Sequence, residues 1–486
     1  MASAATKHTQ HPGVQRSRKQ RFVNKIWDSL DKSPEDRKLI AKIDWFILSY
    51  VCVAYFVKYL DQTNVSNAYI SGMKQDLDMA GNDLNYLTTY WTIGYILGQI
   101  PSQIILTKVQ PSIWLPSLEL IWSILVMAMA ATKDLKTIYI LRFFVGLLEA
   151  SAYPGIMTLL GNWYQPSELA KRACIFQASS SVAQMFGGYL QAALYANMNG
   201  AHGLAAWRWL FIFDGVIGIP IALYGYFAIP DSPTTTKARW LTSAEKQRAI
   251  QRMESVGRKP AKSLTLRNII NLFREWPVYL FTLSFTCYIQ ATRVYAYFNV
   301  WLKETGNYTV EQANVIPTAG YGTLVFFTLF FAWTSDGLNN RWLVIVFGAT
   351  LSLIGAIILS VSVRPDGNTA AIIAGFILTY LVTGTAGIYM TYITEVCNYS
   401  YEHRALIIAL ADTAGYVFVA WLPLFTFNTG EAPWFKIGYK MTAIFLGLQI
   451  FFILLVPIAR NRWPVGKYQH NPGNMREHDT EAQPAV

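Results

Sequence analysis

Twelve mainly apolar stretches of about 20 residues follow one another along this chain, and they constrain its fold more than any other feature. A helix of about 20 apolar residues spans the hydrocarbon core of a bilayer. Only 14% of the residues are charged, which is low for a soluble protein of this length. We therefore predict an all-α membrane protein with twelve transmembrane helices. The predicted spans are 43–65, 84–107, 112–131, 137–160, 173–195, 207–228, 277–301, 313–334, 342–363, 370–394, 405–427 and 437–459.

The basic residues predict how these spans are oriented. Lys and Arg number ten in the first 42 residues, ten more in the segment between the sixth and seventh spans, and four in the C-terminal tail. All three segments lie on one side of the membrane, and the excess of Lys and Arg places that side in the cytoplasm. This accounts for the net charge of +11, so we expect no nucleic-acid partner. The predicted parts are a cytoplasmic tail 1–42, a six-helix bundle 43–230, a cytoplasmic linker 231–276, a second six-helix bundle 277–459 and a cytoplasmic tail 460–486.

Two ionisable residues lie inside the fourth span, in the stretch LRFFVGLLEASAYPG at 141–155. Arg142 and Glu149 are seven residues apart, so they share one helix face with Gly146 and Tyr153 and lie about 10 Å apart along the axis. An ionisable side chain at the centre of a bilayer costs about 2.5 to 3.5 kcal/mol on insertion scales, so such residues usually face a polar cavity. We predict a substrate cavity here. An ion pair that only ties two helices together is the alternative.

A second polar group lies in the first span, where Lys58, Asp61 and Gln62 line one side of the helix at spacings of three and four. In the seventh span Arg293 lies at a depth comparable to that of Lys58. We predict that Arg293 contacts an anion. A structural pair with an acid of the fourth or eleventh span is the alternative.

Tyrosines of the second half are further candidates for the cavity wall. Tyr297, Tyr389 and Tyr392 offer hydroxyl groups and flat ring faces to an organic solute. Aromatic residues in helices also serve in packing, which is the alternative for all three.

Glu149 is the first candidate for carrying a proton, because burial favours the protonated form of a carboxyl group. Asp61 is the second, although a structural pair with Lys58 explains it equally well, and Asp412 in the eleventh span remains open. For Asp214 in the sixth span we expect a pair with Arg208 near the outer surface. No nucleophile with a base, metal-ligand spacing or phosphate loop is present, so we expect no enzyme, no cofactor and no metal.

Several motifs resemble a known family. They are YLDQTNVSNA at 59–68, GQIPSQIILTKVQPSIWLP at 98–116, RFFVGLLEASAYPG at 142–155, WYQPSELAKR at 163–172 and WRWLFIFDG at 207–215. Together they resemble the major facilitator superfamily, in its fungal anion:cation symporter branch of allantoate permeases, and most of all the fungal pantothenate transporters. The resemblance implies two six-helix halves with a site between them at the midplane. It also implies that Asp61 and Glu149 are protonatable and that Arg142 binds the anion.

One position departs from the pattern of that branch. The branch has Asp-Arg-Thr-Asn in helix 1, where the Arg helps bind an anionic substrate, and this chain has Gln62 there. Lys58 lies one turn earlier on the same face and still supplies a cation.

The expected function is proton-coupled import of a small organic anion by alternating access, with a vitamin carboxylate such as pantothenate as the leading substrate. Biotin, nicotinate and allantoate remain open as substrates, and a nutrient receptor that does not transport is the alternative from another class. We expect a multi-pass monomer in the lipid bilayer of the plasma membrane with both termini in the cytoplasm. Asn307, in an Asn-Tyr-Thr sequon of an outer loop, is a glycosylation candidate.

Overall fold

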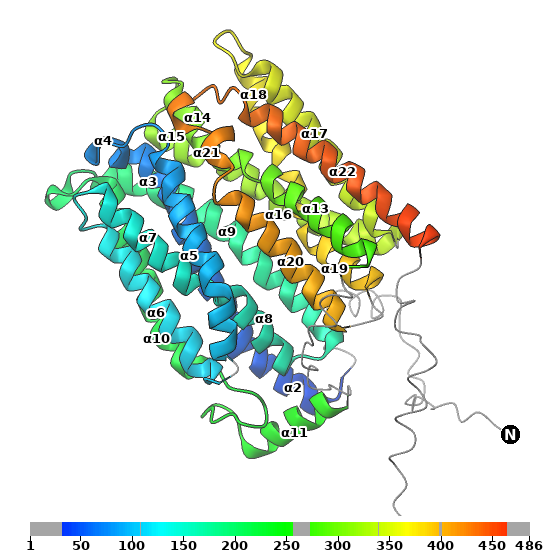
Figure 1. The fold of residues 1–486 in the computed structure, drawn as a ribbon. Helices are drawn as coiled ribbons and strands as arrows, with labels where there is room; N and C mark the ends of the chain where they lie inside the picture. Colours follow the sequence, from blue (N-terminus) through cyan, green and yellow to red (C-terminus); the bar gives the residue numbers. More distant parts are fainter. Residues whose placement is uncertain (1–31, 107, 256–272, 339, 398–400, 464–486) are drawn as a thin grey trace, which may run out of the picture.

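The structure is a computed structural model that describes residues 32–106, 108–255, 273–338, 340–397 and 401–463. Long helices run side by side through the molecule (Figure 1). Among the described residues, nine helical segments are long and apolar enough to cross a membrane.

The first half of the chain supplies the helices drawn in blue to green in Figure 1. A π-helical segment, Asp44–Leu48, makes α2 and α3 one continuous rod, and a second one, Tyr69–Met73, joins α3 to α4. The bounds are α2 Pro34–Ile43, α3 Ser49–Ala68, α4 Lys74–Asp76, α5 Asp83–Leu106, α6 Pro111–Met129, α7 Leu135–Glu149, α8 Ala152–Trp163, α9 Pro166–Met198, α10 Ala206–Ala228 and, in the linker, α11 Ser243–Glu254.

The second half supplies the helices drawn in green to red. Short 3₁₀ turns interrupt two of its spans, at Val294–Tyr297 and at Leu381–Thr385. The bounds are α13 Trp276–Ala291, α14 Phe298–Glu304, α15 Val310–Val315, α16 Thr318–Leu338, α17 Arg341–Ser362, α18 Thr369–Thr379, α19 Ala386–Val396, α20 Tyr401–Val419, α21 Pro423–Thr426 and α22 Gly438–Arg462.

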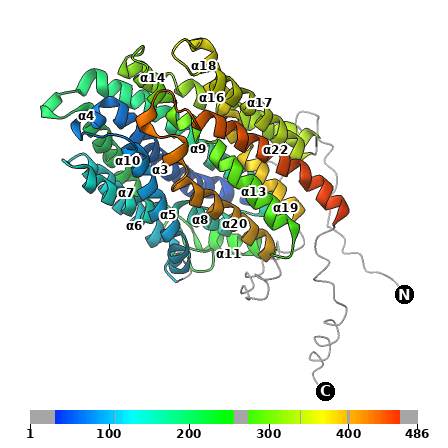
Figure 2. The same cartoon turned by 45° about the horizontal axis from the view of Figure 1, so that its top comes forward.

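Each of the twelve predicted spans corresponds to a helix or to an interrupted pair of helices. Three of them, α5, α9 and α13 with α14, are not among the nine apolar segments and complete the twelve. In α9 the polar side chains Gln177, Gln184 and Gln191 lower the hydrophobicity. The structure is thus the all-α bundle of two six-helix halves that the sequence predicts, and Figure 2 shows the two groups of helices from a second side.

Small residues allow α5 and α7 to pack closely. An added Cβ would lie 2.1 Å from the carbonyl oxygen of Phe143 at Gly94, and 2.0 Å from that of Trp91 at Gly146. Only glycine fits such an approach of two backbones. This contact fixes the position of the helix that carries Arg142 and Glu149.

The two halves meet where α9 packs against α15 and α16, and where α5 packs against α20. The bundle has an α14 end, where α4, α14, α15 and α21 lie, and an α11 end, where α2 and α11 lie (Figure 1).

Hydrogen bonds between the halves gather at the α14 end. Asn85 of α5 donates to the carbonyl oxygens of Phe427 and Pro423, at 2.7 and 3.3 Å, and accepts from the hydroxyl of Tyr297 at 2.7 Å. Lys74 and Glu304 form a salt bridge of 2.6 Å across the same junction. The bundle is therefore closed at its α14 end.

Buried salt bridges fix the linker helix α11 to the first half. Arg172 of α9 donates to both carboxylate oxygens of Asp44, at 2.6 and 2.8 Å, and to the carbonyl oxygen of Glu168 at 3.1 Å. The Glu168 carboxylate accepts from Arg252 of α11 at 2.5 Å. Arg172 and Glu168 are fully buried. Each charge in this network therefore depends on its partner.

A more exposed pair adds to this contact. Lys42 donates to both carboxylate oxygens of Glu245 in α11, at 2.8 and 3.0 Å. Desolvation acts to raise the pKa of Glu245, but hydrogen bonds from Lys42 and Thr242 outweigh it and hold that pKa below its usual value. Glu245 is therefore ionised at neutral pH, and the pair stays intact.

We expect Arg172→Ala to destabilise the fold by about 3 kcal/mol, because the substitution leaves Asp44 without its buried cation. The readout is the thermal midpoint of the purified protein in detergent. Lys171→Ala, which removes the same charge from the next and less buried position, is the matched control and should leave the midpoint nearly unchanged. Equal midpoints for the two variants would contradict the assignment.

Candidate functional site

Five of the predicted site residues come together between α3 and α7. Lys58, Asp61, Arg142 and Glu149 are all at most 3% exposed. The side-chain amide of Gln62 donates to a carboxylate oxygen of Glu149 at 3.0 Å. The charge of Glu149 acts on both Lys58 and Arg142, and the charge of Asp61 acts on Arg142. The structure thus brings the polar group of the first span beside that of the fourth span, and the roles of these residues remain predictions.

Several polar atoms of this cluster have no hydrogen-bond partner within the described part of the chain. They are both carboxylate oxygens of Asp61, Nε and Nη1 of Arg142, and Oε1 of Glu149. A buried polar group left unpaired costs about 1 to 3 kcal/mol, more when it is charged. Such a set of free donors and acceptors is suited to a polar ligand that satisfies them.

Aromatic rings surround the two cations. The ammonium nitrogen of Lys58 lies 4.8 Å from the ring centroid of Tyr95 and 5.9 Å from that of Tyr55. The guanidinium carbon of Arg142 lies 6.0 Å from the ring of Trp91. These contacts stabilise a positive charge away from water. Sequence analysis missed these three aromatic residues, although the spacing of four between Trp91 and Tyr95 places both on one face of α5.

The fourth span breaks directly after Glu149, which ends α7, and α8 begins at Ala152. Pro154 therefore lies in the first turn of α8, where its missing N–H costs nothing. Its ring cannot accommodate the carbonyl group four residues earlier, at Ala150, which explains the break. The break at Ala150 and Ser151 thus lies three to four residues before Pro154.

Asp412 brings an acid from the second half to this cluster. Its charge acts on Lys58, and Gln99 of α5 is a polar neighbour. Tyr416, one turn later in α20, packs its ring 5.1 Å from the ring of Tyr95, over which Lys58 lies. The charges of carboxyl groups from both halves therefore act on Lys58.

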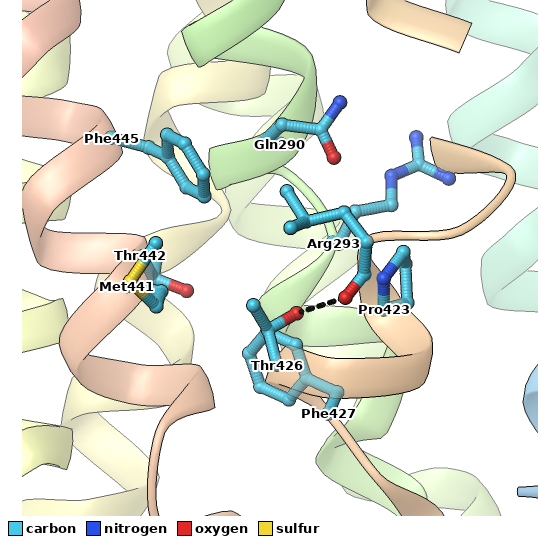
Figure 3. A pocket seen from close by; sticks show the side chains of 9 residues that line it. Gln290, Arg293, Pro423, Thr426, Phe427, Met441, Thr442 and Phe445 are labelled. Carbon is cyan, nitrogen blue, oxygen red and sulfur yellow. Dashed lines mark hydrogen bonds between the residues drawn. The ribbon is translucent and has the colours of Figure 1, made fainter. Parts of the chain in front are cut away.

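The structure places Arg293 in a different surrounding. It lines a small pocket with Gln290 of α13, Thr426 of α21 and Thr442 of α22 (Figure 3). Gln290 donates to the carbonyl oxygen of Gly415 at 2.9 Å. Within the described residues Nε of Arg293 has no hydrogen-bond partner. Its contact with an anion remains a prediction.

The three predicted tyrosines lie apart from the cluster of α3 and α7. Tyr297 stacks on Phe427 with ring centroids 4.6 Å apart, as part of the closed α14 end. Tyr389 donates to the hydroxyl of Ser284 in the packed core of the second half. Tyr392 packs edge-on against Phe281. Their role in substrate binding stays a prediction.

The expected pair of Asp214 with Arg208 is wrong. Arg208 donates to the carbonyl oxygens of Ala130 and Thr132, at 2.7 and 2.6 Å. Asp214 is 1% exposed and accepts both of its hydrogen bonds from Asn64 of α3. Six residues along α10 separate Arg208 from Asp214, so the two side chains face different neighbours.

Two further expectations concern metals and glycosylation. Among the described residues, no three His, Cys, Asp or Glu side chains are grouped so that they could hold a metal ion. Asn307 is exposed, two residues before Thr309 caps the start of α15. Its glycosylation remains a prediction.

Comparison with known proteins places this geometry in a family. The family model of the Major Facilitator Superfamily matches residues 51–423. The chain belongs to the major facilitator superfamily. Among its relatives, the MFS transporter PfmaC of Pestalotiopsis fici is 39% identical over 446 residues, which cover 90% of this chain and 83% of that protein.

Two other relatives of this superfamily member are named as pantothenate transporters. The transporter liz1 of Schizosaccharomyces pombe is 37% identical over 82% of this chain and 78% of its own length. The transporter FEN2 of Saccharomyces cerevisiae is 31% identical over 89% of this chain and 86% of its own length.

A solved structure shares the fold. The xylose transporter XylE from E. coli, in a partially occluded inward open conformation, superposes with a TM-score of 0.65 over 85% of this chain and 99% of its own, at 14% identity. The protein is therefore a multi-pass membrane transporter that resembles fungal pantothenate transporters.

The glycine contact below the site gives a test of its architecture. We expect Gly146→Ala to push α7 away from α5, because the added methyl group meets the carbonyl oxygen of Trp91, and overpacking of this kind costs about 1 to 3 kcal/mol. The yield of monodisperse protein and its thermal midpoint should both fall. Gly447→Ala is the control, since nothing lies within 4 Å of an added Cβ there. A midpoint of Gly146→Ala equal to that of the control would argue against the close approach of α5 and α7.

Proposed function

We propose that this transporter imports a small organic anion together with protons, and that a vitamin carboxylate such as pantothenate is the substrate. The relatives named as pantothenate transporters support this substrate class. The observation that carries the proposal is the buried pair of cations, Lys58 and Arg142, beside the carboxyl groups of Asp61 and Glu149. The cations bind the substrate carboxylate, and a carboxyl group binds the proton.

Competition for the two cations couples the proton to the substrate. Ionised Glu149 acts on both Lys58 and Arg142, so it competes with the substrate carboxylate for them. Protonation of Glu149 removes this competitor and leaves both cations to the substrate. Gln62 holds the Glu149 side chain in place, because its amide donates to the carboxylate and can accept from the protonated acid.

Alternating access then moves substrate and proton together. Both bias the same equilibrium between states open to opposite sides of the membrane, which is the source of coupling. The Lys and Arg distribution supports a cytoplasmic α11 end and an extracellular α14 end in the plasma membrane. In this orientation the closed α14 end is the outer gate and Asn307 faces outward. Arg293 is a third cation, which belongs to the second half.

Uptake of a labelled panel tests the substrate class. Pantothenate, biotin, nicotinate and allantoate are supplied at acid and neutral pH to cells that lack their own transporters. We expect accumulation of pantothenate, faster at acid pH. Accumulation of another compound in its place would overturn the proposal that pantothenate is the substrate. Binding without uptake would support the receptor alternative.

Lys58→Ala and Arg142→Ala test anion recognition. Each removes a buried cation, and we expect the half-saturation concentration for uptake to rise more than about tenfold, which corresponds to about 1.4 kcal/mol of binding free energy. The surface level of the protein, measured in the same cells, separates this from poor folding. Lys440→Ala, an exposed lysine of α22, is the control with the same change of charge. Unchanged half-saturation in both site variants would remove these residues from the site.

Glu149→Gln tests proton coupling. The glutamine is neutral at every pH, as protonated Glu149 is, so net accumulation and its pH dependence should disappear. Exchange of external for internal substrate should survive, because exchange requires no release of a proton. Glu311→Gln, in the first turn of α15, is the matched control and should accumulate substrate as the parent does. If Glu149→Gln still concentrates substrate with the parent pH profile, Asp61 or Asp412 becomes the carrier to test.

A further inference from the structure

A chain of buried amides links the first half to the second. The amide of Asn299 in α14 donates to the side-chain oxygen of Asn67 at 3.3 Å. Asn67 donates to the side-chain oxygen of Asn64 at 3.4 Å. Asn64 donates to both carboxylate oxygens of Asp214 in α10, at 2.7 and 3.0 Å. All four side chains are buried, so water does not take the place of a lost hydrogen bond in this chain.

The bonds of this amide chain all point in one direction. Each amide donates with its nitrogen and accepts with its oxygen, and the last acceptor is Asp214. An ionised carboxylate accepts only, so it fixes the orientation of Asn64 and through it that of Asn67. At the other end the side-chain oxygen of Asn299 accepts from the backbone N–H of Val300 at 2.8 Å, which anchors that amide.

The first link crosses the junction between the halves, since Asn67 belongs to α3 and Asn299 to α14. It is one of the bonds that close the α14 end. Another such bond, from Asn314 to the hydroxyl of Ser71 at 3.2 Å, crosses the same junction without belonging to the amide chain. The two bonds differ in whether they lead to an acid.

Asp214 lies among other ionisable groups. Asp61 precedes Asn64 by one turn of α3, and the charges of Asp214 and of Glu119 in α6 both act on Asp61. Glu149 and Arg142 of α7 act on Asp61 as well.

Other groups on the elements around α10 are neutral or engaged elsewhere. From α9 the buried neutral side chain of Gln191 is present, and Asp76 at the end of α4 accepts from the indole N–H of Trp207 at 2.7 Å. Arg208, on α10 itself, is held by backbone carbonyl groups. Because the charges of Asp214 and Glu119 act on Asp61, a proton on one of these three carboxyl groups is favoured.

We propose that the amide chain from Asp214 to Asn299 transmits the protonation state of Asp214 to the closure of the α14 end. Ionised Asp214 makes a charge-assisted bond with Asn64, which is about twice as strong as a neutral one. A proton on Asp214 removes that charge and turns one carboxylate oxygen into a donor, so Asp214 no longer fixes the orientation of Asn64 and Asn67, while Asn299 stays anchored by Val300. The link between Asn67 and Asn299 then weakens, and the α14 end opens more readily at acid pH.

This inference deepens the proposed proton coupling, and it makes Asp214, Asn64, Asn67 and Asn299 positioning residues of the gate. They hold the closure without touching the substrate. In a transporter that takes up protons from outside, protonation of Asp214 then favours the state that is open to the outside at the α14 end.

A cross-linking reporter measures the closure without any transport. Lys74→Cys and Glu304→Cys place two thiols where the salt bridge now spans the α14 end. The background replaces the native cysteines, Cys52, Cys174, Cys287 and Cys397, by alanine. The full-length protein in proteoliposomes, without substrate, is treated with a short bifunctional thiol reagent from about pH 8 to about pH 5. The reagent reacts with the thiolate, whose fraction falls with pH, so each cross-linked fraction is divided by that of the pair Lys440→Cys and Ile444→Cys within α22 at the same pH. This ratio reports the closed state.

The reporter should cross-link less at acid pH than at neutral pH. Asn299→Ala should lower the closed-to-open ratio about fivefold, the factor for one net hydrogen bond of about 1 kcal/mol, and remove its pH dependence. Asn314→Ala should lower the ratio similarly and keep the parent pH dependence, because its bond does not lead to Asp214. Asp214→Asn should give the low, pH-independent value of the protonated state.

Three results would overturn the proposal. The first is a reporter without pH dependence, and the second is an Asn299→Ala variant that keeps the parent pH dependence. The third is an Asn314→Ala variant that loses the pH dependence as Asn299→Ala does. The decision does not require Asp214→Asn to fold. The reporter also works whatever the substrate is, so a failure of the pantothenate proposal in uptake leaves these results standing.

Discussion

Charge buried at membrane depth is the constraint on which the rest of this structure depends. Lys58 and Asp61 on α3 and Arg142 and Glu149 on α7 would each cost several kcal/mol against lipid. They therefore face one another between α3 and α7, where Gln62 of α3 donates to Glu149 of α7. The close approach at Gly146 fixes the position of α7 against α5.

The two ends of the bundle are held by different interactions. At the α14 end the polar contacts between the halves are mostly hydrogen bonds of neutral side chains such as Asn85 and Asn299. Each is worth about 0.5 to 1.5 kcal/mol, so the loss of one of them costs little. At the α11 end, buried salt bridges such as that of Arg172 with Asp44 stay within the first half. Removal of one partner of a buried salt bridge destabilises the fold more than the loss of a neutral hydrogen bond does. The linker helix is therefore held firmly to the first half.

Buried polar atoms without a partner are stabilised when a bound polar ligand supplies the missing hydrogen bonds. Asp61, Arg142 and Glu149 bring several such atoms together in one cluster. Most of the other unpaired atoms of the described residues, such as those of Gln191 and Gln449, belong to neutral side chains. Asp412 extends this cluster to the second half, because its charge acts on Lys58. A site that both halves help to form changes when the halves move, which is the requirement for transport by alternating access.

The sequence by itself determined the class, the number of spans and the grouping of Lys58 and Asp61 on α3 and of Arg142 and Glu149 on α7. Hydrophobic length and the spacing of residues along one helix are local properties, so they can be counted in the sequence. Only the tertiary structure decided that Asp214 binds Asn64 instead of Arg208, and that Tyr297 closes one end with Asn85. These contacts join helices far apart in the chain, and no local pattern records which helices become neighbours.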